Sequence, residues 1–309
     1  MDNIVIAALL TAAIVAGTPI LFAALGELLA ERSGILNLGV EGMMLVGAVV
    51  GFIFTIKTGN HWYGFLAAMI SGGMTALIHA FISITLKGNQ VVSGLALTIF
   101  GTGTSGFLGK AYQGLPTSDP VTAIAIPFLS DIPILGRIFF NHDPLVYIGF
   151  ILAIIFWLVM YRTKWGLNIR AVGENPAAAD AVGISVSRVR YFCTIIGGMM
   201  AGLGGAYLSL VYAPSWQENM TAGRGWIAVA LVIFALWNPL WAIAGSYLFG
   251  AVEAMTFGLQ IVGIKISPFF LQMLPYLFTI LVLVIVTIKM RQDAGAPSAL
   301  SVAYDREER

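Results

Sequence analysis

Arg170-Ala-Val-Gly-Glu-Asn-Pro-Ala-Ala-Ala-Asp-Ala-Val-Gly-Ile184 is a polar island between long apolar runs. In a chain that is 59% hydrophobic and only 10% charged, such a segment is expected to lie in water. Its residues follow the pattern of a short capped helix, with Asn175 as N-cap, Pro176 as first helical residue and Gly183 as the stop. The segment predicts a small exposed helix, which is either a docking element for a cytosolic partner or an ordinary loop helix.

Long apolar stretches surround this island and decide the class of protein. Most of them are long enough to cross about 30 Å of hydrocarbon at 1.5 Å per residue. The stretches are Ile4–Ala24, Leu38–Ile56, Tyr63–Leu86, Val91–Leu108, Leu145–Tyr161, Tyr191–Tyr212, Trp226–Trp237, Leu240–Val262 and Phe269–Ile288. They predict an all-α polytopic membrane protein with roughly 8–10 transmembrane helices. The net charge of +1 provides no basic field for nucleic acid.

One stretch, Trp226–Trp237, is too short to cross a membrane alone. Asn238-Pro239 follows it and ends whatever helix it forms. A short helix is tolerated at membrane depth only where it is buried in protein or lines a cavity. This stretch therefore indicates an internal pathway.

The positive residues predict the orientation. They crowd the segment around the island and follow the last apolar stretch: Arg162, Lys164, Arg170, Arg188, Arg190, Lys289 and Arg291. The segment 110–143 carries fewer cations than acids. The positive-inside rule places a loop over 162–190 and the C-terminus in the cytoplasm, and the loop 110–143 and the N-terminus outside. One membrane domain is expected over 1–291, with a disordered cytoplasmic tail over 292–309.

Polar residues inside the apolar stretches are candidates for the pathway. One group is Glu27, Glu31, Arg32, Asn37 and Glu41. Ionisable groups at membrane depth are costly unless they are paired or face a wet cavity. Glu41 follows Asn37 by four residues and is expected to share its helix face. The alternative is a structural Glu–Arg pair at a helix boundary.

Glu253, inside the eighth stretch, is a second candidate of the same kind. It is either a pathway residue or a hydrogen-bonded structural acid between helices. His79, alone on an apolar face, is expected to be a packed residue at a helix contact.

Motifs for nucleotide binding and hydrolysis are lacking. Gly101-Thr-Gly-Thr-Ser-Gly106 matches the dinucleotide pattern but lies in an apolar span with no strand before it. Gly109-Lys110 fails as a phosphate loop, since Thr104 stands in place of the first glycine. The sequence also contains no H-E-x-x-H or G-x-S-x-G motif. We expect no ATP or metal site and no catalysis in this chain alone.

Two motifs resemble a known family. Glu31-Arg-Ser-Gly-Ile-Leu-Asn-Leu-Gly-Val-Glu-Gly-Met-Met44 is similar to the E-R-x-G-x-x-N-[IL]-G-x-E-G-M-M stretch of the nucleoside and simple-sugar branch of ABC importer permeases. Residues 173–184 resemble the cytoplasmic G-x-N-P-x-A-A-x-x-x-G-I loop with which such permeases dock on their ATPase. A looser match runs from Gly223 to Leu240. The resemblance covers roughly residues 17–290 of the branched-chain amino acid, simple-sugar and nucleoside permease family.

The resemblance implies partners and site residues. The residues expected to couple to the ATPase are Gly173, Glu174, Asn175, Pro176, Ala178, Ala179, Gly183 and Ile184. The residues expected along the substrate pathway are Asn37, Glu41, Gln90, Trp226, Phe234 and Glu253. Asn37, Glu41 and Gln90 would supply polar contacts to a nucleoside or related sugar, and the two aromatic rings would supply stacking.

The expected assembly lies in the cytoplasmic membrane of a prokaryote. It contains a cytosolic ABC ATPase that binds ATP and magnesium, and a second homologous permease of which this chain would be the smaller. An extracytoplasmic substrate-binding protein, expected to be a lipoprotein, would deliver the ligand, and membrane lipid would surround the permeases.

Two other functions remain open from the sequence. A proton- or sodium-coupled secondary transporter working alone would use Glu41 and Glu253 as coupling residues. Many secondary carriers show an internal repeat between their halves, and no convincing repeat is visible here. A channel or structural subunit of another membrane complex is the third reading.

Overall fold

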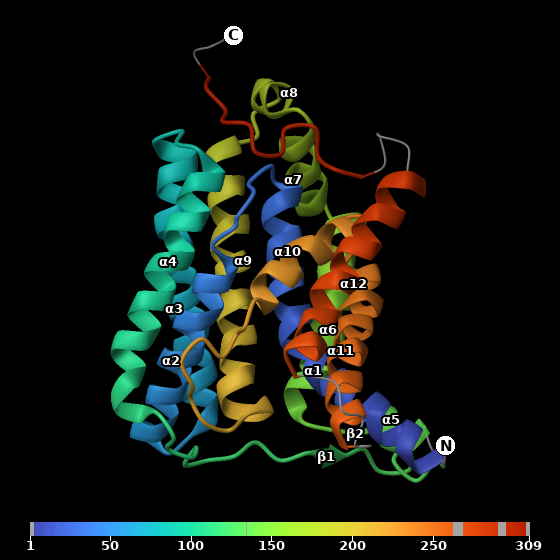
Figure 1. Cartoon of the computed structure of the whole chain (residues 1–309). Helices are drawn as coiled ribbons and strands as arrows, with labels where there is room; N and C mark the ends of the chain where they lie inside the picture. Colours follow the sequence, from blue (N-terminus) through green and yellow to red (C-terminus); the bar gives the residue numbers. More distant parts are fainter. Residues whose placement is uncertain (1–2, 134, 262–267, 290–294, 307–309) are drawn as a thin grey trace.

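The computed structural model describes residues 3–133, 135–261, 268–289 and 295–306, and it is a helical bundle (Figure 1). Its α-helices are α1 (Asn3–Arg32), α2 (Val40–Thr58), α3 (His61–Ala80), α4 (Gln90–Gly109), α5 (Leu135–Phe139), α6 (Pro144–Arg162), α7 (Lys164–Glu174), α8 (Pro176–Ala181), α9 (Val186–Tyr207), α10 (Arg224–Phe234), α11 (Pro239–Ile261) and α12 (Pro268–Lys289). Short π-helical turns, η1 (Phe81–Thr85) and η3 (Leu208–Tyr212), extend α3 and α9, and η2 (Lys110–Tyr112) follows α4. Two-residue strands β1 (Ile124–Ala125) and β2 (Asn141–His142) pair antiparallel.

The prediction of an all-α polytopic membrane protein is confirmed. Among the described residues, 6 helices are long and apolar enough to cross a membrane. The helices α11 and α12, with 23 and 22 residues, are also long enough to cross a membrane. The most extensive packing joins α1, α2, α3, α9 and α11, and the short helix α10 lies against α1. The predicted boundaries Val262 and Arg291 lie outside the described residues.

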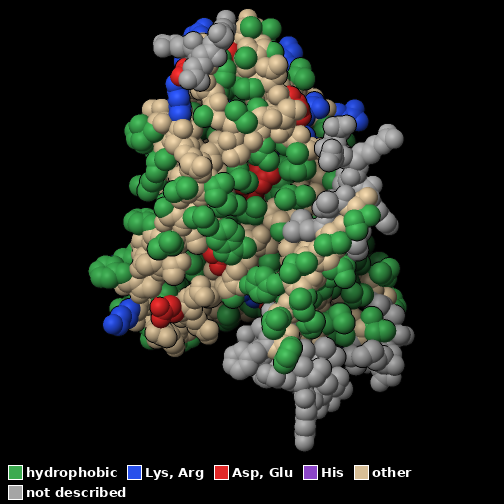
Figure 2. Space-filling model, turned by 45° about the horizontal axis from the view of Figure 1, so that its top comes forward, with side chains coloured by type: hydrophobic (Ala, Val, Ile, Leu, Met, Phe, Trp, Pro, Cys, Tyr) green, Lys and Arg blue, Asp and Glu red, His purple; other side chains and the backbone are tan. Residues whose placement is uncertain are grey.

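The loops separate to two ends of the bundle, as the charge pattern predicts. The start of α1, α5, β1 and β2 lie at one end, and α7, α8 and the C-terminal segment lie at the other (Figure 1). Lys and Arg side chains gather mainly at the end that carries the C-terminus, while hydrophobic side chains cover the middle (Figure 2). Which of the two ends faces the cytoplasm stays a prediction of the positive-inside rule.

The loop 110–143 is folded onto its end of the bundle. The side chain of Asp119 accepts hydrogen bonds from the backbone N–H of His61 (3.0 Å) and lies 2.6 Å from the His61 ring Nδ1. These contacts, the backbone N–H first, hold the pKa of Asp119 below its usual range. The Ser118 hydroxyl donates to the Thr55 carbonyl oxygen at 3.1 Å, so the loop is fixed to the ends of both α2 and α3.

The first two helices differ from the sequence prediction. Helix α1 continues past Ala24 to Arg32, and α2 begins only at Val40. Asn37 therefore lies in the connecting loop (Ser33–Gly39), and the prediction that it shares a helix face with Glu41 is wrong. The chain turns at Gly34, whose φ of +93° lies in a region that glycine adopts readily.

The C-terminal tail also differs from the sequence prediction. Residues 295–306, predicted to be disordered, pack across the end of the bundle beside α7 and α8 (Figure 1). Pro297 and Ala299 are buried, and Leu300 and Tyr304 contact an apolar cluster of the bundle. The few apolar side chains of this largely polar segment thus pack against the bundle. The composition of the segment alone does not predict this packing.

Close backbone contact between α2 and α9 gives a first testable prediction. A Cβ added at Gly205 would lie 1.8 Å from the Met44 carbonyl oxygen. Gly205→Ala is expected to destabilise the bundle by about 1–3 kcal/mol through overpacking. The measurement is the thermal unfolding midpoint in detergent. Gly103→Ala is the matched control, because a Cβ at this α4 glycine meets nothing within 4 Å. Equal midpoints for the two variants would contradict the packing described here.

Candidate functional site

Glu41 joins the starts of two helices inside the bundle. It lies in the first turn of α2, and its carboxylate caps the start of α10. Oε1 accepts hydrogen bonds from the Thr221 hydroxyl (2.6 Å) and the Gly223 N–H (2.8 Å). Oε2 accepts from the Gly225 N–H at 2.6 Å. Both α2 and α10 begin part-way along the bundle (Figure 1), so a carboxylate satisfies free N–H groups at a helix N-terminus in the protein interior.

The backbones of α2 and α10 approach each other closely at this junction. The φ of +82° at Gly223 places the chain in the left-handed region just before α10. A Cβ added at Gly225 would lie 2.5 Å from the Glu41 Cα. The Glu41 residue is 5% exposed. Its carboxylate is thus committed to the α2–α10 junction, where it fixes the position of the short helix.

Glu253 belongs to a second cluster at the same helix end. Its carboxylate forms an ion pair with Arg224 and accepts a hydrogen bond from the Tyr212 hydroxyl at 2.9 Å. The Arg224 guanidinium lies 5.2 Å from the centre of the Tyr212 ring. The ion pair ties the first residue of α10 to α11. From the sequence, Arg224 belonged to a motif but was not predicted as a site residue. Its position as a positively charged first residue of a short helix inside the membrane domain is the signal that could have identified it.

The α1–α2 loop is held by buried polar side chains. The Leu36 N–H donates to Gln90 Oε1 at 2.8 Å, and the Asn37 N–H donates to Glu27 Oε1 at 2.9 Å. His79 Nε2 lies 3.1 Å from the Leu36 carbonyl oxygen, so this residue has a polar role besides packing. Among the described residues, Gln90 Nε2 and Glu27 Oε2 have no hydrogen-bond partner. The structure thus brings the predicted pathway residues Asn37 and Gln90 to one loop and adds Glu27.

The two predicted aromatic pathway residues lie apart. Trp226 is half-buried near the start of α10, and Phe234 is the last residue of that helix. Eight residues of α-helix separate them by about 12 Å along the axis. Phe234 packs against Gly245 of α11, where an added Cβ would lie 2.9 Å from its ring. One small ring cannot stack on both at once.

Helix α8, at the end of the bundle that carries the C-terminal segment, has the capped geometry that the sequence predicts. Asn175 Oδ1 accepts from the Ala178 N–H at 2.9 Å, and Pro176 is the first helical residue. The chain leaves the helix at Gly183, with a φ of +87°, and the Ile184 N–H donates to the Ala179 carbonyl oxygen at 3.0 Å. The side chains left exposed are small and apolar: Ala177, Ala178, Ala181 and Val182. The preceding helix α7, which carries Gly173 and Glu174, was not predicted.

Helix α8 connects to the interior through one apolar cluster. Ala179, 3% exposed, belongs to the same cluster as Leu28 of α1 and Val232 of α10. Glu31 Oε2 accepts from the indole N–H of Trp237 at 2.6 Å. The Arg32 guanidinium Nε donates to the Trp237 carbonyl oxygen at 3.1 Å. Glu31 and Arg32 therefore both bind the turn after α10, and the structure joins α8, the end of α1 and the end of α10.

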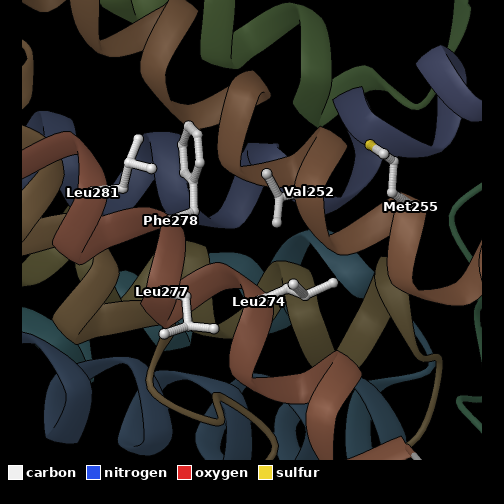
Figure 3. A pocket seen from close by; sticks show the side chains of 6 residues that line it. All are labelled: Val252, Met255, Leu274, Leu277, Phe278 and Leu281. Atoms are coloured by element: carbon white, nitrogen blue, oxygen red, sulfur yellow. The ribbon is translucent and has the colours of Figure 1, made fainter. Parts of the chain in front are cut away.

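An apolar groove lies elsewhere, between α11 and α12 (Figure 3). It has a volume of about 320 Å³, and its lining side chains are Val252, Met255, Leu274, Leu277, Phe278 and Leu281. Among the described residues, its lining side chains are all apolar. Among the described residues, no three His, Cys, Asp or Glu side chains gather in a way that could hold a metal ion.

Comparisons with known proteins show the family of this chain. Residues 9–287 match the family model described as branched-chain amino acid transport system / permease component. TsgC13 of Haloferax volcanii, which bears the name "Putative glucose ABC transporter permease protein", is 42% identical over 97% of this chain and 98% of its own length. The guanosine ABC transporter permease protein NupQ of Bacillus subtilis is 35% identical over 99% of this chain and 98% of its own.

A third relative and a solved structure extend the comparison. The nucleoside ABC transporter permease protein NupC of Lactococcus lactis is 36% identical over 93% of each chain. The fold is similar to that of a solved ABC transporter in an inward-facing conformation, with a TM-score of 0.53 and 14% identity over 91% of this chain and 85% of the other. These likenesses do not favour a secondary transporter that works alone. The chain belongs to the family of branched-chain amino acid transport system permease components, and it is a multi-pass permease subunit of an ABC transporter in a prokaryotic plasma membrane.

Proposed function

We propose that this permease imports nucleosides, or a related simple sugar, together with a separate ATPase. The observation that carries the proposal is the capped helix α8, whose exposed apolar side chains face outward while Ala179 joins the cluster that reaches α1 and α10. Such a helix can receive a push from a cytosolic subunit and pass it to the interior. ATP and magnesium would bind to that partner, and this chain would carry no cofactor and catalyse no reaction alone.

The transport step is a rigid-body switch between outward- and inward-facing states. Closure of two ATPase subunits would move α8, and the apolar cluster would move α10 with it. Because Glu41 and the Arg224–Glu253 pair fix the start of α10 to α2 and α11, that motion reaches the middle of the membrane. Asn37 lies on the loop that leads into α2, and Gln90, the first residue of α4, contacts that loop at Leu36; we propose that both contact the substrate there.

The names of the relatives and the chemistry of the interior support the proposed substrate class. NupQ is named for guanosine, NupC for nucleosides, and TsgC13 and TsgB13 of Haloferax volcanii for glucose. A neutral ring with several hydrogen-bonding groups suits a path with few charges, polar side chains and aromatic faces. We propose nucleosides as the primary substrates, with Trp226 as the aromatic contact.

A second, different permease chain is part of the proposal. The chain covers 98% of TsgC13 and of NupQ. It covers only 63% of TsgB13 and 64% of NupP, which come from the same two organisms and are 26% identical to it. This difference supports a heterodimer in which this chain is the smaller permease. An extracytoplasmic binding protein, proposed to be a lipoprotein, would deliver the substrate to the end that carries the loop 110–143.

Competition for uptake tests the substrate class. The transporter, purified with its native partners and reconstituted in vesicles, is expected to accumulate radiolabelled guanosine when ATP is supplied. Excess adenosine or uridine should reduce this uptake, whereas excess glucose should not. Accumulation of labelled glucose that nucleosides fail to inhibit would assign the sugar instead.

A further inference from the structure

The C-terminal segment Gly295–Arg306, here called the C-terminal strap, joins parts of the bundle that are far apart in sequence. The Ala299 N–H donates to the Gly173 carbonyl oxygen at 2.9 Å, at the end of α7. Two residues later, the Ser301 N–H donates to the Gly34 carbonyl oxygen at 3.1 Å, in the α1–α2 loop. The strap therefore connects α7, the helix before α8, to the α1–α2 loop, which contains Asn37.

The side chain of Arg190 also connects the strap to the α1–α2 loop. Its Nε donates to the Ser33 carbonyl oxygen at 3.2 Å, and its Nη1 donates to the Val302 carbonyl oxygen at 3.1 Å. The residue is 1% exposed, and among the described residues no carboxylate lies within ion-pair distance of it. Through these two hydrogen bonds, one side chain of α9 holds two chain segments in a fixed relation, while its Nη2 has no hydrogen-bond partner among the described residues.

The end of the strap contacts α8 itself and a further turn. Arg306 Nε lies 3.1 Å from Asp180 Oδ2 on α8. Asp305 forms an ion pair with Lys87, in the turn between α3 and α4. Ser298 Oγ donates to Glu174 at 2.8 Å. The strap thus touches the coupling helices on one side and the turn before Gln90 on the other.

We infer that the C-terminal strap and Arg190 couple α8 to the α1–α2 loop during transport. The apolar cluster carries movement of α8 to α10, and the strap carries it to the loop whose residues lie beside Gln90 and Glu27. Arg190 acts as a positioning residue, because it reaches the loop and the strap but not the proposed path. This inference rests on the proposed function, and it adds a second route from the ATPase to the substrate.

The test uses the complete transporter in vesicles and measures ATP hydrolysed per substrate transported. Deleting residues 295–309 is expected to leave the ATPase bound and hydrolysing while substrate uptake falls at least about fivefold, the low end of typical coupling effects. Arg190→Lys keeps the charge but loses the planar fork, so it should raise the ratio to an intermediate value. Val302→Ala, at a 52% exposed side chain, is the control and should leave the ratio unchanged.

The outcomes separate the possible failures. An unchanged ratio in both the deletion and Arg190→Lys would overturn the inference. Loss of the ATPase from the deleted transporter would also overturn it, since the strap would then serve docking rather than coupling. If the deletion does not fold, judged by its thermal unfolding midpoint, the ratio for Arg190→Lys decides. Absence of ATP-driven uptake in the wild-type transporter would count against the proposed function instead.

Discussion

Glu41→Ala is expected to unfold the α2–α10 junction and to reduce ATP-driven uptake to background. The carboxylate accepts hydrogen bonds from Thr221, Gly223 and Gly225, and all three donors would be left in the interior without it. Hydrogen bonds to a charged group contribute about 1.5–3 kcal/mol each. Loss of the set is therefore expected to cost about 3 kcal/mol or more, which is a large share of the stability of a typical domain.

Glu41→Gln separates the structural role from the transport role. The amide keeps one oxygen acceptor but brings an NH2 group against the Gly225 N–H, so the start of α10 must shift. We expect a smaller loss of stability than with alanine, and uptake reduced far more than ATPase binding. Glu218→Gln is the matched control at an exposed acid in the loop before α10. Unchanged uptake in Glu41→Gln would show that the path does not depend on this junction.

Replacing Asn175 and Pro176 together by alanine and glycine is expected to abolish ATP-coupled uptake while the protein still folds and inserts. Helix α8 has 6 residues, which is too short to be stable without its cap and its packing. Loss of an N-cap costs about 0.5–2 kcal/mol, and loss of Pro176 frees the first turn. Because α8 lies at the end of the bundle, the loss remains local (Figure 1).

The measurement for this variant combines co-purification of the ATPase with uptake. The double variant is expected to release the ATPase, or to keep it without transport, at an unchanged yield of membrane protein. Asn60→Ala is the matched control, because Asn60 caps α3 at the opposite end by accepting from the Trp62 N–H at 2.8 Å. If both variants reduce uptake equally, the effect would be one of stability, and the coupling role of α8 would be contradicted.

Local signals in the sequence predict some parts of this structure well. The cap, the first-turn proline and the stop at Gly183 are encoded within ten residues, and α8 forms as they indicate. The break after Trp237 is likewise local, since Pro239 begins a new helix. Such features depend on backbone chemistry that neighbouring residues determine.

Other parts depend on partners that are distant in sequence. The Arg224–Glu253 pair and the cap of α10 by Glu41 join residues 29 and 184 positions apart, so no local pattern reveals them. Helix α1 continues beyond its apolar stretch because Glu27 and Glu31 find donors in Asn37 and Trp237. The tail looks unstructured by composition, yet Pro297 and Ala299 are buried against the bundle. In each case tertiary contacts outweigh the local preference.

The central claim is that movement of α8, driven by a partner ATPase, powers transport through this chain. The most direct measurement is guanosine accumulation by vesicles that contain the transporter purified with its native partners, with and without hydrolysable ATP and with ionophores that collapse proton and sodium gradients. Accumulation should require ATP hydrolysis and persist when both gradients are collapsed. Accumulation without ATP that disappears with the ionophores would contradict the account, and it would favour a secondary transporter.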